Sequence, residues 1–550
     1  MSADGSIEMK RTRRAQTAAT THFFTRPLGK GGLRGGLRRL KSPLPRNRLL
    51  WAIILLGVSL RVASALYQGD AVTAMPGVFD QISYHKLALR VMEGNGFSFD
   101  TGWWPATSAY QPTAHWSFLY VLFLAGIYFV VGPMPLVPKL IQAVLTGIFI
   151  PLITWRIGRR LFGQRVGLVS ATLTAFYAYF VYYAGALVTE SFFTLAVLWA
   201  LDISTALADP SNRQCSGKEL KPWVYLGLAF AAAALLRQTI LLLVPFVLAW
   251  IGWQVRRPAP SESPLLGGDR RLQPSGVGRG DSQQPTPTPL QRRGIIASWY
   301  SRQNPLLGGD RRLQPSGVGR STKTPVVPLL SRMTLTVLIV FAFILPWTVR
   351  NYRVFGQFVL LNTNAGFAFF WGNHPIHGTE FIPLLPDYGA LIPRELHGLN
   401  EAQMDRALLQ RGIAFVLQDP TRYFLLSVSR AREYFKIWPS QGSSVLSNYA
   451  RVLSFGLCLP FLLSGLLLAL LVVSGRISYG HQQDSSGILL LILVSGLYSL
   501  IYFMTWTLVR YRLPVDAITM PFTALSMVYA YDRVFGATQV AGVPLPRPAD

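Results

Sequence analysis

Residues 49–67 read LLWAIILLGVSLRVASALY, an almost wholly apolar run. A helix needs about 20 mostly apolar residues to cross the hydrocarbon core of a bilayer, so this run predicts a transmembrane helix. Comparable runs recur further along the chain, at 137–154, 166–186, 191–207, 223–236, 238–253, 331–348, 451–474, 487–506 and 513–531. Together they predict an all-α polytopic membrane protein with about 10–11 transmembrane helices.

The composition agrees with this fold class. Of 550 residues, 51% are hydrophobic and only 14% are charged, and the formal net charge is +27. A basic chain of this kind can bind nucleic acid, but here the Lys and Arg residues concentrate in the segments that flank apolar runs. That pattern is typical of the charge bias that orients membrane helices. We therefore expect membrane lipids, and no nucleic acid, as partners.

The same charge bias divides the chain into five parts. The glycine-rich basic tail and the central loop, which contains PLLGGDRRLQPSGVGR twice, have the composition of disordered cytoplasmic segments. The expected parts are a tail (1–48), an amino-terminal transmembrane module that carries the catalytic residues (49–253), the central loop (254–330), a carboxyl-terminal module with an outer loop at 349–450 (331–531) and a second tail (532–550). We expect a plasma-membrane protein with a cytoplasmic amino terminus.

Whether an eleventh apolar run, 116–132, crosses the membrane is a separate question. The basic cluster from Arg156 to Arg165 should be cytoplasmic, like the amino-terminal tail, so an even number of crossings must separate the two. If 49–67 and 137–154 both cross, then 116–132 cannot. We interpret it as lying along or dipping into the outer leaflet, with the alternative that it crosses and one neighbour does not.

The first outer loop contains the stretch FDQISYH at 79–85. Helical spacing of apolar residues from Asp80 predicts a short amphipathic helix that starts near Asp80 and ends at Gly94. A carboxylate at a helix N-terminus stays ionised and can act as a base, although such a residue is often only a helix cap. His85 is a weaker candidate, because a histidine on the wet face of this helix needs no further role.

A second carboxylate, Glu190, follows the span 166–186 and is predicted on the same side of the membrane as Asp80. Charges at such an edge usually face a cavity or a partner, although Glu190 can also simply start the next helix. Several arginines, Arg510 among them, are predicted near this side, and three of them are candidate ligands for phosphate: Arg237, Arg350 and Arg512. Their planar guanidinium groups suit phosphate oxygens, while snorkelling towards lipid headgroups is the simpler alternative.

In their order along the chain, these residues resemble the polyprenyl-phosphate-sugar-dependent membrane glycosyltransferases of glycosyltransferase family 39, the protein mannosyltransferase and aminoarabinose transferase group. The resemblance covers about 50–531. It rests on short motifs: Asp80 with Tyr84 and His85, Gly94 to Phe97, Gly158 to Gly163, Thr189 with Glu190, Arg237, Trp347 to Tyr352, Gly372 with Asn373, and Arg510 to Pro514. The chain departs from the family in Gln81, where many relatives carry a second acid, and in YQPTAH at 110–115.

The resemblance implies transfer of a sugar from a polyprenyl phosphate to an acceptor hydroxyl at the outer face, as part of cell-envelope glycosylation. It assigns Asp80 as the base and Glu190 as a helper, with Tyr84, His85 and the three arginines as substrate-binding residues. Direct displacement would invert the anomeric carbon. The acceptor, whether protein, lipid or glycan, and any divalent metal stay open.

A multi-pass transporter or lipid-carrier flippase is the alternative class, because it too would have about ten helices and a few embedded charges. Transporters usually hold their ligand groups near the midplane on broken helices, often in two repeated halves. In this sequence the candidate acids gather at one edge and no half-to-half repeat is visible. We therefore favour the enzyme.

Overall fold

The structure, a computed structural model, describes residues 46–75, 78–103, 107–209, 219–256, 326–385, 387–439, 445–477 and 485–540. Most of the predicted tail 1–48, of the duplicated loop and of the second tail lies outside these residues. The described residues form helices and turns. They contain isolated β-bridges but no β-strand. The predicted all-α polytopic fold is confirmed.

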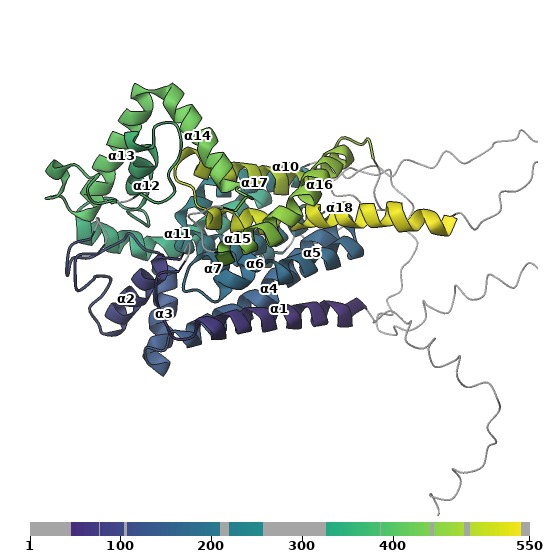
Figure 1. Ribbon diagram of the computed structural model, residues 1–550, viewed down its shortest axis with the longest axis horizontal. Coiled ribbons are helices and arrows are strands. Elements are labelled where there is room, and N and C mark those ends of the chain that lie inside the picture. The colour runs from purple at the N-terminus through teal and green to yellow at the C-terminus, as the bar shows by residue number, and fades with distance from the viewer. Residues whose placement is uncertain are drawn as a thin grey trace, which may run out of the picture.

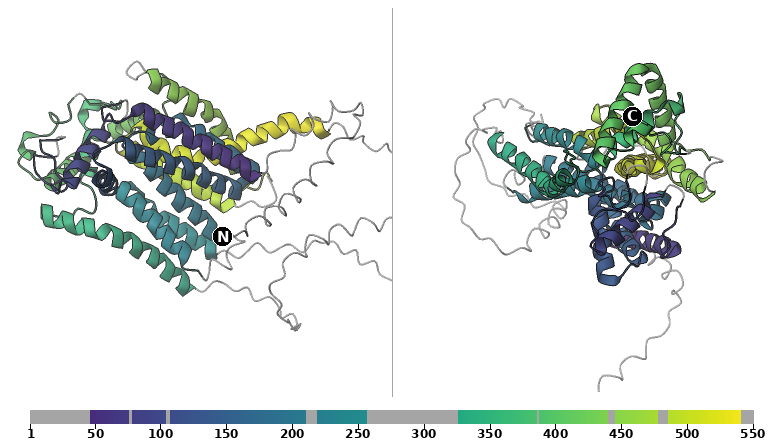
Figure 2. Two further views of the ribbon diagram at one scale, coloured as in Figure 1. Left: turned by 90° about the horizontal axis from the view of Figure 1, so that it is seen from below. Right: turned by 90° about the vertical axis from the view of Figure 1, so that its left-hand side faces the viewer.

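Long helices run side by side as a bundle (Figures 1 and 2). They are α1 (Arg46–Gln68), α4 (Leu136–Phe162), α5 (Gln164–Phe176), α6 (Ala178–Ala184), α7 (Glu190–Ala208), α9 (Lys221–Leu236), α10 (Val244–Arg256), α11 (Val326–Phe355), α16 (Leu457–Val473), α17 (Ser485–Met504) and α18 (Leu513–Val540).

Eight described helices are long and apolar enough to cross a membrane, or nine if the bent pair α5 and α6 counts as one span. The sequence predicts ten to eleven. The difference lies mainly in α9, which has 16 residues. At 1.5 Å per residue it is about 24 Å long, shorter than the hydrocarbon core of about 30 Å.

The segment around 116–132 forms α3 (Phe118–Val131), which lies across one end of the bundle rather than along it (Figure 1). Contacts between the helices on either side show that it does not cross. The Asp70 carboxylate, just after α1, accepts a hydrogen bond from Leu136 N at 2.9 Å, at the start of α4. Lys139 Nζ donates to the carbonyl of Gly69 at 2.8 Å. The chain therefore leaves α1 and enters α4 at the same end of the bundle.

The break between α5 and α6 is held by a buried cation. The two helices meet at Tyr177 with a bend of 52°. Arg61 of α1 is fully buried and donates to the carbonyls of Thr174 at 2.8 Å and Ala175 at 3.1 Å. Backbone carbonyls freed by a helix break need a new donor inside a membrane, and Arg61 supplies it.

The end of the bundle where α3 lies is called the loop-bearing end. A layer of shorter helices, which we call the covering layer, lies over it (Figure 1). It consists of the first loop, with α2 (Asp80–Met92), and the later segment with α12 (Ala365–Asn373), α13 (Glu401–Gln418) and α14 (Pro420–Tyr434). Glu401 joins the two segments: its carboxylate accepts from Thr107 Oγ1 at 2.9 Å, from Ala114 N at 2.8 Å and from the Thr363 hydroxyl. These two distant stretches of sequence thus form one layer.

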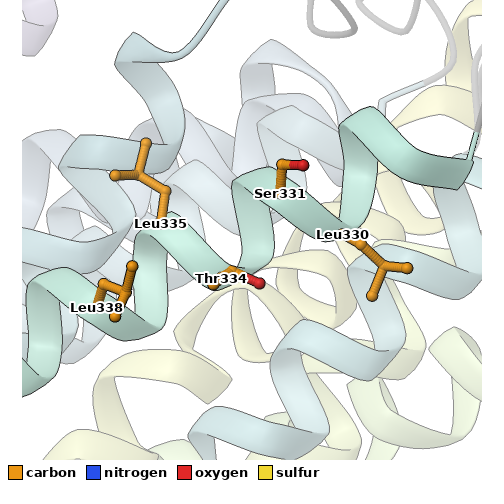
Figure 3. Close-up of a pocket in the computed structure, with 5 residues that line it drawn as sticks. All are labelled: Leu330, Ser331, Thr334, Leu335 and Leu338. Carbon is orange, nitrogen blue, oxygen red and sulfur yellow. The ribbon is translucent and has the colours of Figure 1, made fainter.

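A groove of about 510 Å³ lies along α11 near its first turns, lined by Leu330, Ser331, Thr334, Leu335 and Leu338 (Figure 3). The other end of α11, with Arg350, reaches the loop-bearing end, so the groove is remote from the candidate acids. It contributes nothing to the site described below.

Close packing of α16 on α18 gives a first testable prediction. A Cβ added at Gly465 of α16 would collide with the carbonyl oxygen of Phe522 in α18, whereas one added at Gly496 of α17 would meet nothing within 4 Å. Overpacking of this kind costs about 1–3 kcal/mol. We expect Gly465→Ala to lower the thermal midpoint of the purified protein and Gly496→Ala to leave it unchanged or raise it. Equal midpoints for the two variants would contradict this packing.

Candidate functional site

Asp80 is the first residue of α2, as the sequence predicts, but its side chain caps nothing. The residue before it, Phe79, occupies the cap position without a side-chain hydrogen bond. Instead the Asp80 carboxylate forms an ion pair with Arg510, which lies in the short turn η9 (Val509–Arg512) before α18. The first loop and the last transmembrane helix therefore meet at this carboxylate.

Glu190 is the first residue of α7 and binds two arginines. Its Oε1 lies 3.1 Å from Arg510 Nε and 2.5 Å from Arg237 Nη2. Arg237 separates α9 from the following turn in an extended conformation, and its Nε also donates to Thr189 Oγ1 at 3.1 Å. The structure thus brings four charged groups into one row, in the order Asp80, Arg510, Glu190 and Arg237, which we call the charge row.

Exposure changes along the charge row. The side chain of Asp80 is 30% exposed, whereas those of Arg510 and Glu190 are 7% and 2% exposed. The two carboxylates balance the two guanidinium groups in formal charge, which is the condition under which buried charges persist in a protein. Asp80 is therefore the more accessible of the two acids, and Glu190 is the one that pairs with both arginines.

Aromatic rings surround the charge row. Tyr84 lies one turn after Asp80 on α2, is buried, and packs edge-on against Trp116 and Tyr120 with ring centroids 5.6 and 5.0 Å away. Burial, and secondarily the charge of Asp80, raises the pKa of the Tyr84 phenol, so this group stays neutral. In the covering layer, burial raises the pKa of the Tyr388 phenol, with smaller contributions from Tyr511 and Asp80.

His85 and Arg350, both candidates from the sequence, lie elsewhere. His85 Nδ1 is 2.9 Å from the hydroxyl of Tyr128 in α3, and burial and the nearby Lys139 lower the His85 pKa. Arg350 Nη1 donates to the carbonyl of Thr113 at 3.0 Å, and its guanidinium lies 4.5 Å from the Trp347 ring centre. Neither residue contacts the charge row in the described structure.

Arg512 forms a second buried ion pair, with Asp516. Its Nε donates to Asp516 at 2.9 Å and its Nη1 to the carbonyl of Tyr434 at 2.7 Å, while Tyr177 donates its hydroxyl to Asp516 at 2.7 Å. Arg510, two residues earlier, takes the place between the two candidate acids. The turn η9 is a 3₁₀ helix with three residues per turn, so side chains two positions apart point in different directions. Only one of Arg510 and Arg512 can therefore face the acids.

The sequence does not single out Trp506, which precedes the turn η9, or Tyr388, which belongs to the covering layer. Trp506 lies four residues before Arg510, and its ring centre is 5.3 Å from that of Phe381 and 5.9 Å from that of Tyr388. Gly372 allows α12 to approach this segment, because an added Cβ there would collide with the carbonyl of Thr505. The covering layer is therefore packed directly on the segment that carries Arg510.

The sequence leaves open whether a divalent metal ion takes part. No group of three or more His, Cys, Asp or Glu side chains is placed to hold one in the part of the chain that the structure describes. The two acids of the charge row instead share the guanidinium of Arg510.

Comparison with known proteins agrees with this architecture. Residues 117–268 match the family described as dolichyl-phosphate-mannose-protein mannosyltransferase, and no curated protein matches the chain by sequence. Among solved structures, the oligosaccharyltransferase of Archaeoglobus fulgidus in its apo form is 14% identical, with a TM-score of 0.50 over 90% of this chain and 52% of that one.

The same archaeal protein, AglB, in complex with an inhibitory peptide and a dolichol-phosphate gives a TM-score of 0.50 at 14% identity, over 91% of this chain and 52% of that one. This chain spans about half the length of these structures. At such identity the likeness shows the fold alone. The family match over 117–268 agrees with the resemblance that the sequence predicts, and the apolar helices make the chain a multi-pass membrane protein.

Proposed function

Because the chain carries a segment of the dolichyl-phosphate-mannose-protein mannosyltransferase family, we propose that it transfers a sugar from a polyprenyl-phosphate donor to an acceptor hydroxyl at the non-cytoplasmic face of the membrane. The observation that carries the proposal is the charge row, which joins a partly exposed carboxylate to two arginines at one end of the bundle. A base and a set of phosphate-binding cations are what this reaction requires.

The donor is a phosphodiester with one negative charge, and the leaving polyprenyl phosphate gains a second. The acceptor oxygen forms a bond to the anomeric carbon while the bond from that carbon to the phosphate oxygen breaks, and the bonding electrons leave with the phosphate. Cations that bind the growing charge replace an acid catalyst. We assign this role to Arg510 and Arg237.

The proton of the acceptor hydroxyl goes to Asp80, the general base. Glu190 is a positioning residue, because it holds both arginines and is too buried to meet the acceptor. Tyr84, buried one turn after Asp80, remains a candidate for contact with a substrate bound at that carboxylate. His85, Arg350 and Arg512 remain candidates for substrate contacts outside the charge row, and attack opposite the phosphate inverts the anomeric centre.

The proposed outer-face position supports a lipid-linked donor. Nucleotide sugars are made in the cytoplasm, so a reaction at the other face needs a sugar carried through the bilayer. Asp80 lies at the first loop beyond α1, where a headgroup at the membrane edge can reach it.

The test is a reconstituted assay with the full chain in lipid nanodiscs, polyprenyl-phosphate sugars labelled in the sugar, and hydroxyl acceptors of the protein, lipid and glycan classes. We expect cleavage of the sugar–phosphate bond and an inverted product, and parallel reactions with a chelator determine whether a metal takes part. If proteoliposomes instead move the intact lipid between leaflets without cleaving it, the chain is a flippase and the proposal is wrong.

A further inference from the structure

Helices α13 and α14 form a hairpin that projects sideways past the flank of the bundle at the loop-bearing end (Figure 1; Figure 2, right). The inner face of α14 is firmly attached. Leu426, Arg430 and Tyr434, spaced four residues apart, are all buried. Arg430 donates to the carbonyl of Phe503 at 3.1 Å, at the end of α17. The hairpin is thus a fixed part of the protein that overhangs the region beside the bundle.

The opposite face of α14 is apolar and uncovered. Phe424, Leu425, Val428 and Phe435 are 66%, 45%, 45% and 41% exposed. At 100° per residue these side chains fall on one side of the helix, turned away from Leu426. We call these four residues the α14 stripe. A soluble surface rarely exposes so many large apolar side chains in one row.

The α14 stripe ends against the next candidate membrane span, Ser447–Val473, where the ring of Phe435 stacks on that of Phe455 with centroids 6.3 Å apart. After α14 the chain passes Trp438, which is 74% exposed, to the helical run from α15 (Val445–Ala450) through η8 (Arg451–Gly456) to α16. On that run Tyr449, Leu453 and Leu457, again four residues apart, are 62%, 61% and 58% exposed. Through the contact of Phe435 with Phe455, the exposed apolar side chains of this run adjoin those of the hairpin.

The residues beside the α14 stripe indicate what covers it. The exposed Arg432 lies on the same side of α14, one turn before Phe435, and the exposed Trp438 follows. Aromatic residues with a neighbouring cation are typical of segments at the level of lipid headgroups, where rings lie among the acyl ends and the cation meets phosphate. A protein partner would not need this contact with a candidate membrane span.

We propose that the α14 stripe binds the membrane itself, at the headgroup and acyl boundary of the leaflet on the loop-bearing side. The bilayer then fixes the height of the covering layer, since α14 is tied through Arg430 to α12 and α17. This inference rests on the geometry of α14 and not on the proposed function, so either can fail without the other.

The test uses nitroxide labels on the full chain in nanodiscs, in a background where Cys215 and Cys458 are replaced. Labels are placed at Phe424 and Val428 in the α14 stripe, at Leu463 on the lipid-facing side of α16 as a positive control, and at the exposed Gln410 of α13 as a water-facing control. All four positions are surface sites, so labelling leaves the fold intact.

Accessibility to oxygen, which partitions into lipid, is compared with accessibility to a water-soluble nickel complex. We expect the oxygen-to-nickel ratio at 424 and 428 to be several-fold higher than at 410 and to lie between the values at 410 and 463. A ratio equal to that at 410 would show a water-facing stripe and overturn the proposal. Protection from both reagents would show that a protein, such as a second copy of the chain, covers the stripe, and would equally overturn it.

Discussion

Asp80→Asn is expected to lower the rate of sugar transfer by about 10²–10⁴-fold, the usual contribution of a general base. The amide cannot take the acceptor proton, but it can still accept a hydrogen bond from Arg510. Donor affinity, measured as KM, should therefore change little while kcat falls. The measurement is initial-rate kinetics in nanodiscs, with protein yield and gel-filtration profile recorded for each variant.

Asp100→Asn is the matched control. Asp100 is an exposed carboxylate of the same loop whose one described side-chain contact is with its neighbour Thr101. Its replacement removes the same charge from the same face and should leave the rate within about twofold of wild type, since a rim charge mainly affects association. Unchanged transfer by Asp80→Asn, or equal losses in both variants, would remove Asp80 from its assigned role.

Glu190→Gln is expected to have the second large effect, on folding as well as on rate. Glu190 is 2% exposed and binds both Arg510 and Arg237. Removing its charge leaves one more buried guanidinium than carboxylate in the charge row. Breaking a buried ion pair in this way typically costs about 3–5 kcal/mol. We expect a lower thermal midpoint and a lower yield of folded protein, measured in the same nanodiscs.

A double variant tests whether the stability loss in Glu190→Gln comes from the unbalanced charge or from the changed side-chain shape. Adding Arg237→Gln to Glu190→Gln restores the balance, because Asp80 and Arg510 remain as a pair. The double variant should therefore be more stable than Glu190→Gln alone, a coupling that a double-mutant cycle measures. Additive losses would mean that the contact between Glu190 and Arg237 contributes nothing of its own. Activity should stay low in both variants, because each disturbs the proposed phosphate-binding cations.

The sequence predicts the part of this architecture that depends on hydropathy and charge sign. The apolar runs give the long helices, and parity between the basic segments predicts that 116–132 does not cross, in agreement with the position of α3. The same parity puts Asp80 and Glu190 on one side, and the structure joins both to Arg510. These properties are local or cumulative along the chain, so a single sequence contains them.

The choice between Arg510 and Arg512 could not be made in the same way. Both lie in one short segment, and which of them turns towards the acids depends on the geometry of η9 and on the packing of Trp506 against the covering layer. The position of His85 beside Tyr128 likewise depends on how α2 packs on α3. Such contacts join residues far apart in sequence, and periodicity does not report them.

The proposed reaction requires that the charge row faces the non-cytoplasmic side of the membrane. A cysteine at Thr101, an exposed residue of the first loop, should react with an impermeant maleimide on intact cells, in a background without native cysteines. A cysteine at Arg165, whose side chain is 75% exposed at the opposite end of the bundle, should react only after permeabilisation. The reverse pattern, with Arg165→Cys labelled from outside and Thr101→Cys protected, would place the two acids in the cytoplasm and contradict the proposed reaction.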